Sequence, residues 1–248
     1  MYKIKKIFKA IERFLVRAGK LIDSNSKTIS LFLSIVAIAV TLFNVQQIKK
    51  QANLISGLTT PEGKVVADSE SIKDKIPSNT PFLGNPKAKL IIVEFGDYQC
   101  PYCGKFHSEY LPKLKRDYLD NNKAKFVFLN VAFLGQESKD AAEASYCARD
   151  QGKFWEYHDV LFSNQKAENS GAFSGANLKK FATSIGLDIN AFQTCTASGK
   201  YTKLIADNLA LASKYGINAT PGFIIGNQSI KGALPFANFK QAIDSQFK

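Results

Sequence analysis

The sequence predicts an α/β domain preceded by an N-terminal transmembrane helix, and three observations support this prediction. Residues 28–45 carry no charge and are largely apolar, over a length near the minimum of about 17 residues for a membrane-spanning helix. Residues 89–95 form a continuous apolar run, typical of a strand covered on both faces, and helical periodicity follows it. Almost ninety residues with helical spacing lie between a second strand near 125–131 and Thr220, and a hairpin follows at 223–231.

The first fifty residues are strongly basic. They hold ten Lys or Arg and two acidic residues, which gives +8 of the chain's net charge of +12. Eight of these cations precede the apolar run and two follow it, so the positive-inside rule predicts a cytoplasmic N-terminus. Because the charge lies beside an apolar stretch and no nucleic-acid motif is recognised, the partner indicated is the membrane, not nucleic acid.

Three successive segments are predicted before the folded domain. In residues 1–27, apolar side chains recur at helical spacing between Lys and Arg, which indicates an amphipathic helix on the cytoplasmic membrane surface. Residues 28–45 are interpreted as a signal anchor in the inner membrane, and the polar residues 46–80 as a linker with an end-to-end distance of roughly 30–35 Å. The domain at 81–248 is then expected in the periplasm or an equivalent extracytoplasmic space.

A cleaved signal peptide is the competing interpretation of the apolar run. Ala37 and Ala39 have the small-x-small pattern of a cleavage site, but the run continues past them through Phe43. The basic leader before the run is also long for a signal peptide. The sequence therefore favours a retained, single-pass anchor.

Cys100 and Cys103, with Pro101 and Tyr102 between them, lie where the buried strand turns into a helix. Unpaired amides and the helix dipole at this position stabilise an anion, so Cys100 is predicted to be a thiolate at unusually low pH. The spacing lets Cys103 close a disulfide with Cys100 or attack a mixed disulfide there. Pro101 suits the first helical position, where its missing N–H costs nothing.

Half of a zinc site is the alternative for this motif. Zinc would need two further ligands, and neither Cys147 nor Cys195 belongs to a second such pair. The strand–turn–helix context favours redox chemistry with no metal or other cofactor. His107 and His158 are interpreted as surface or core packing residues.

Glu94 is a carboxylate inside the apolar strand. If it is buried, desolvation raises its pKa, and it can relay the proton of Cys103. An acid on an edge strand that reaches water is the alternative. At the hairpin, Pro221 precedes a strand and on the residues alone is best explained as an ordinary trans turn residue.

Two helices can be assigned from their apolar faces. One follows Cys103 and is predicted to kink at Pro112. The other stops at Gly216. The apolar face of this second helix consists of Tyr201, Leu204, Ile205, Leu209 and Ala212.

Three segments carry a family resemblance: GNPKAKLIIVEFGDYQCPYC at 84–103, GKFWEYHDVLF at 152–162 and GINATPGFIIGN at 216–227. In this order they resemble the DsbA-like branch of the thioredoxin superfamily, over roughly residues 81–246. The resemblance implies a thioredoxin-like fold with a helical domain inserted at about 134–216, which caps the active-site groove.

The resemblance also implies roles for individual residues. Pro221 would be a cis-proline packed against the Cys100–Cys103 disulfide, and Thr220 and Pro221 would present backbone to an extended substrate peptide. Glu94 would relay protons.

Some relatives have a second disulfide in the helical insert, which here would join Cys147 and Cys195. It would contribute roughly 3–4 kcal/mol by closing its loop. Two independent buried thiols are the alternative.

The leading functional hypothesis is oxidation of cysteines in exported proteins, with a membrane quinone-linked enzyme restoring the Cys100–Cys103 disulfide. The alternatives are a reductase or isomerase of the same fold, and a tethered chaperone whose cysteines are structural. Tyr102 occupies the place where the strongest oxidants of the family have His. Because Tyr102 supplies no cation beside the thiolate, a weaker oxidant is expected.

Overall fold

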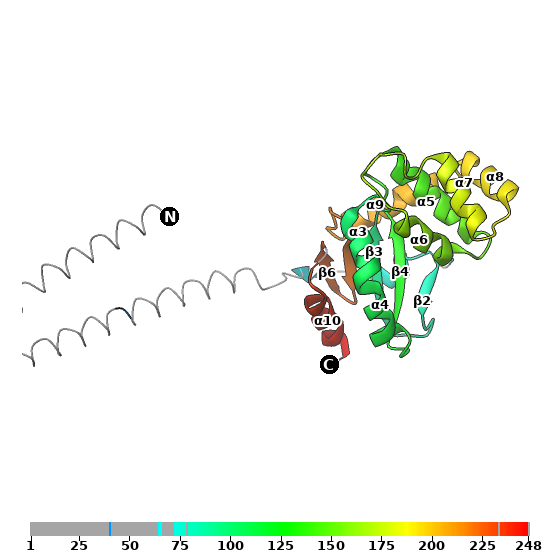
Figure 1. Cartoon of the computed structure of the whole chain (residues 1–248). Coiled ribbons are helices and arrows are strands. Elements are labelled where there is room, and N and C mark those ends of the chain that lie inside the picture. Colours follow the sequence, from blue (N-terminus) through cyan, green and yellow to red (C-terminus); the bar gives the residue numbers. More distant parts are fainter. Residues whose placement is uncertain (1–39, 41–63, 66–71, 78, 233, 248) are drawn as a thin grey trace, which may run out of the picture. The chain divides into compact units, whose positions relative to one another are not determined.

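A mixed sheet lies at the centre of the domain (Figure 1). The computed structural model describes residues 40, 64–65, 72–77, 79–232 and 234–247. Within these residues six strands pair in the order β1-β6-β5-β3-β4-β2. The strands are β1 (Lys64–Val65), β2 (Phe82–Gly84), β3 (Leu90–Gly96), β4 (Ala124–Asn130), β5 (Gly222–Ile225) and β6 (Gln228–Lys231).

Strand β3 is buried along its whole length because a strand pairs with each of its edges and apolar side chains cover both of its faces. It pairs in parallel with β4 and antiparallel with β5. Leu90 and Ile92 point into one apolar cluster, and Ile91, Val93 and Phe95 into the other. This alternation explains why the strand is a continuous apolar run in the sequence.

The helices occupy both faces of the sheet. Phe106 and Leu114, and Ile243 from the C-terminal helix, cover the face of Ile92, while Ile72 and Tyr215 cover the opposite face. The helical elements are η1 (Ile72–Lys75), α3 (Pro101–Lys105), η2 (Phe106–Tyr110), α4 (Leu111–Leu114), η3 (Lys115–Leu119), α5 (Gln136–Arg149), α6 (Phe154–Ser163), α7 (Gly175–Ser184), α8 (Ile189–Ser198), α9 (Thr202–Lys214), α10 (Phe236–Asp244) and η4 (Ser245–Phe247).

The helix after Cys103 is irregular near Pro112, the residue at which a kink is predicted. Segments α3, η2, α4 and η3 follow one another without a break, and η2 and η3 are π-helical turns. Pro112 lies in the first turn of α4, directly after the first π turn. A widened turn accommodates a residue that has no N–H for the helical ladder.

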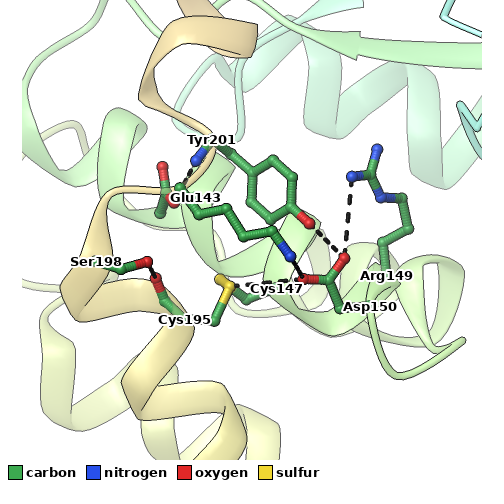
Figure 2. Close-up of polar contacts among 8 residues, drawn as sticks. Glu143, Cys147, Arg149, Asp150, Cys195, Ser198 and Tyr201 are labelled. Carbon is green, nitrogen blue, oxygen red and sulfur yellow. Dashed lines mark hydrogen bonds and ion pairs between the residues drawn. A yellow bond between two sulfur atoms is a disulfide. The ribbon is translucent and has the colours of Figure 1, made fainter.

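Helices α5–α9 form the predicted insertion between β4 and β5, and α5 contacts α6, α8 and α9 (Figure 1). A disulfide between Cys147 and Cys195 joins α5 to α8, with an S–S distance of 2.03 Å (Figure 2). Beside it, Asp150 accepts hydrogen bonds from Lys200 Nζ, at 2.7 Å, and from the Tyr201 hydroxyl. These contacts fix the turn between α8 and α9 against the end of α5.

Helix α9 differs from the prediction at one position of its buried face. Tyr201, Ile205 and Ala212 are buried as expected, but Leu209 is 39% exposed. The buried residue is Asn208, whose amide donates to Asn130 O at 3.1 Å and to a tyrosine hydroxyl of α5 at 2.9 Å. An asparagine satisfied by core oxygens can occupy a position that apolar periodicity assigns to its neighbour.

The folded domain also begins before the predicted boundary at residue 81. Residues 64–65 of the predicted linker pair with β6, and Ile72 is 4% exposed within the apolar cluster of Val93. Residues 61–248 form one unit. The predicted anchor at 28–45 lies outside the described residues except for Val40, and the described part of the chain contains no helix with the length and hydropathy of a membrane span.

Candidate active site

The turn from β3 into α3 places Cys100 at the N-cap of a helix. Its φ and ψ of −70° and 118° are extended, and Pro101 starts the helix. The amide of Cys100 donates to Asp97 O at 3.0 Å, and the amide of Gly104 donates to Cys100 O at 3.1 Å. The Cys100 side chain therefore lies beside the unpaired amides of the first helical turn.

The two sulfur atoms have different environments. Both cysteines are free thiols in this structure, Cys100 5% exposed and Cys103 fully buried. A hydrogen bond from the Cys103 thiol, assisted by the Thr220 side chain and the amides of Cys103 and Tyr102, lowers the pKa of Cys100 to about 6, although burial opposes this shift. The more accessible sulfur is thus the more easily ionised one.

The pKa of Cys103 is shifted in the opposite direction from that of Cys100. Burial, the hydrogen bond to Cys100 and the nearby negative charges of Glu94 and Cys100 raise its pKa well above that of an ordinary thiol. Cys103 therefore keeps its proton while Cys100 is a thiolate. This asymmetry makes Cys100 the sulfur that exchanges with an outside partner, and Cys103 the internal one.

The loop before β5 faces Cys100. The peptide bond between Thr220 and Pro221 is cis, so the trans turn favoured by the residues alone is wrong. Cys100 Sγ lies 3.3 Å from Thr220 O, and the strand that begins at Gly222 pairs with β3. The structure therefore brings together the two segments, 120 residues apart, that the family resemblance linked.

Glu94 lies in β3, near both sulfurs. It is 3% exposed, and β3 lies between β4 and β5, so the alternative of an edge strand is wrong. Burial, followed by the charge of Cys100, raises the pKa of Glu94 well above its usual value. Its Oε1 atom has no hydrogen-bond partner among the described residues. A carboxyl group whose pKa is raised by burial is suited to take up and release a proton.

Asp97 fastens the active-site turn, and the sequence analysis assigned it no role. Its carboxylate accepts hydrogen bonds from Gln99 N at 2.9 Å, Ser138 Oγ at 2.6 Å, Phe133 N at 3.0 Å and Leu134 N at 3.2 Å. Four donors satisfy a side chain that is only 1% exposed. The turn is thereby attached to the segment that leads from β4 into α5.

Gln165 lies in the inserted helical region and bonds to the backbone of the active-site turn. No pattern in the sequence indicated a role for it. Its Nε2 donates to Tyr98 O at 2.7 Å and to Cys100 O at 2.8 Å. Gly104 makes room for this side chain, since a Cβ there would lie 2.1 Å from Gln165 Oε1.

Two large apolar side chains near the turn are exposed. Tyr102, between the cysteines, is 61% exposed, and Phe133, whose amide is bonded to Asp97, is 45% exposed. Both belong to segments held at the Cys100 turn. They offer apolar surface to an unfolded or extended polypeptide.

Comparison with known proteins gives consistent matches from a family model, a curated relative and solved structures. A family model described as Thioredoxin matches residues 77–245. Disulfide bond formation protein D of Bacillus subtilis is 32% identical over 173 residues, 68% of this chain and 77% of that protein. The structure of oxidised BdbD from Bacillus subtilis has a TM-score of 0.63 and 30% identity, covering 68% of this chain and 92% of that one. A thioredoxin-like oxidoreductase from Silicibacter pomeroyi has a TM-score of 0.59 and 31% identity over 69% and 94%.

The ionisation of Cys100 can be measured by following alkylation rate or thiolate absorbance against pH in the reduced protein. We predict a transition near pH 6, absent in Cys100→Ser. The pKa of Cys100 is lower in the folded than in the unfolded protein, so ionisation of Cys100 stabilises the folded, reduced protein. This stabilisation is complete above the ordinary thiol pKa and is lost as the pH falls through about 6. The free energy of unfolding, relative to that of Cys100→Ser, should therefore rise as the pH is increased from about 6 to the ordinary thiol pKa. A transition at the ordinary thiol pKa contradicts the assignment.

Proposed function

Because this chain belongs to the thioredoxin family, in its DsbA-like branch of thiol:disulfide oxidoreductases, we propose that it oxidises cysteine pairs of exported proteins through a Cys100–Cys103 disulfide. One observation carries the proposal. The more accessible of the two sulfurs, that of Cys100, has a pKa lowered to about 6 and lies 3.3 Å from the carbonyl oxygen of Thr220, beside the cis-proline.

The proposed reaction has two exchange steps. A substrate thiolate attacks Cys100 Sγ, the more exposed sulfur, and breaks the Cys100–Cys103 bond; Cys103 leaves and takes up a proton. A second substrate thiolate then attacks the substrate sulfur of the mixed disulfide and releases Cys100 as a thiolate. The substrate gains a disulfide and loses two electrons, which the two cysteines hold as the dithiol seen here. A leaving group with a low pKa favours the second step.

The low pKa of Cys100 also supports the oxidative direction. Stabilising one sulfur as an anion stabilises the reduced protein, and a stable reduced form is what makes a disulfide oxidising. The names of relatives as disulfide bond formation proteins agree with this direction. A membrane quinone-linked enzyme is the proposed oxidant that restores the disulfide. A reductase would run the same two steps in reverse.

We further propose that residues 28–45 anchor the chain in the cell membrane with the redox domain on the outer side. The support is the uncharged apolar run and the eight cations before it. An anchored chain should stay with the membrane fraction after an alkaline wash, and protease added outside should digest the domain. Release by the wash contradicts the anchor.

Glu94 is proposed to exchange the proton of Cys103 in these steps. Glu94→Gln should slow attack by Cys103 on a mixed disulfide at Cys100 by about tenfold or more, because general acid–base groups contribute at least this much. Stopped-flow measurement of this step against pH checks the prediction. Glu156→Gln, the same change at an exposed site, is the control. Equal rates and pH profiles in all three proteins would exclude a proton-transfer role.

The whole proposal can be tested by trapping substrates. Cys103→Ser leaves Cys100 able to form a mixed disulfide but removes the thiol that resolves it. This variant, expressed in cells, should accumulate reducible adducts that mass spectrometry identifies as exported proteins with cysteine pairs.

The double variant Cys100→Ser/Cys103→Ser is the matched control and should form no adducts. If Cys103→Ser also forms none, and Cys100→Ser leaves client folding unchanged, the chain acts as a tethered chaperone with structural cysteines. Adducts with cytoplasmic proteins alone would contradict the proposed location.

A further inference from the structure

Two histidines and an aspartate meet beside the redox helix. His107 lies in η2, four residues after Cys103, and His158 and Asp159 are consecutive residues of α6. One potential ligand atom from each lies within 4.8 Å of the other two. The imidazole centroids are 5.1 Å apart, and His107 Nε2 is 3.6 Å from Asp159 Oδ1. The redox chemistry described above uses none of these side chains.

We propose that His107, His158 and Asp159 bind one divalent transition-metal ion of the Zn²⁺ class. Two imidazoles and a carboxylate are a ligand set that zinc uses, with a fourth position open to water. In a tetrahedral site with Zn–N bonds of about 2.0–2.1 Å, two imidazole centroids lie about 5 Å apart. The two rings already have this separation.

The surroundings of His158 orient its ring for this role. The Tyr98 hydroxyl is 3.1 Å from His158 Nδ1, and the ring packs against Phe128 and Trp155. When the Tyr98 hydroxyl accepts a hydrogen bond from Nδ1, the lone pair remains on Nε2. Metal-binding histidines are commonly fixed by such a bond at the second nitrogen.

His107 is mostly buried, and Asp159 gives the site a path to solvent. The His107 ring stacks on Phe162 at 5.0 Å, and its Nδ1 is buried without a hydrogen-bond partner among the described residues. The Asp159 side chain is 65% exposed, so it can rotate to shorten the ligand distances. Glu156 adds a negative charge nearby and Lys115 a positive one. Aromatic packing accounts for the positions of the two rings, and the potential ligand atoms of all three residues lie within 4.8 Å of one another.

A metal ion here would join the redox helix to the insertion. His107 belongs to the continuous helix that starts at Pro101, directly after Cys100, and α6 belongs to the inserted domain. Through Tyr98, the same ion would hold the turn that carries Cys100. Binding should therefore raise the thermal stability of the protein as well as occupy the site.

The test uses the full chain without a polyhistidine tag, with both cysteine pairs oxidised so that no thiol can bind metal. Calorimetric titration with Zn²⁺ should show one saturable site. Co²⁺ should give visible absorption bands of a four-coordinate ion. The melting temperature should rise with Zn²⁺.

The variants His107→Gln and Asp159→Asn should each weaken Zn²⁺ binding by about tenfold or more, since each removes a direct ligand. Asp207→Asn, an exposed aspartate of α9, is the matched control and should bind as the wild type does. The metal-free melting temperature of each variant checks that it is folded. Absence of a saturable site in the wild type overturns the proposal, as does unchanged affinity in His107→Gln and Asp159→Asn.

Discussion

The hydrogen bonds that converge on Cys100 Sγ are the interaction on which the chemistry of this protein depends. They come from the Cys103 thiol, the Thr220 side chain and the first amides of α3, and they lower the Cys100 pKa to about 6 against the opposing effect of burial. The amides and the Cys103 thiol belong to the first turns of α3, and Thr220 lies 120 residues from Cys100 in the chain. The fold therefore has to hold the helix start, the second cysteine and the loop before β5 in one place.

The rest of the domain does this with buried polar side chains. Asp97 attaches the turn to the segment after β4, and Gln165 attaches it to the inserted helices through two backbone oxygens. Within the insertion, the Cys147–Cys195 disulfide and the hydrogen bonds of Asp150 join α5 to α8 and to the turn that follows α8. Glu94 is a buried carboxyl group whose Oε1 has no hydrogen-bond partner among the described residues, which agrees with the proton-transfer role proposed for it.

Local signals in the sequence were enough to predict the strand before Cys100, the helix start and the hairpin, because each depends on neighbours in the chain. The cis-proline and the second disulfide followed only from the family resemblance, since they depend on contacts between distant segments. Asn208 took the buried place expected for Leu209 because its amide is satisfied by core oxygens. Asp97 and Gln165 were missed because polar residues in a turn give no sign of their partners. The predicted linker, residues 46–80, extends too far into the folded domain because a two-residue strand such as β1 has no recognisable sequence pattern.

The reduction potential of the Cys100–Cys103 pair tests the central claim most directly. Equilibration with glutathione buffers, with the fraction of dithiol measured by alkylation and mass spectrometry, gives its value. Stabilisation of the Cys100 anion in the reduced protein predicts a potential clearly above that of thioredoxin, which is about −270 mV. A potential at or below that of thioredoxin would contradict the account.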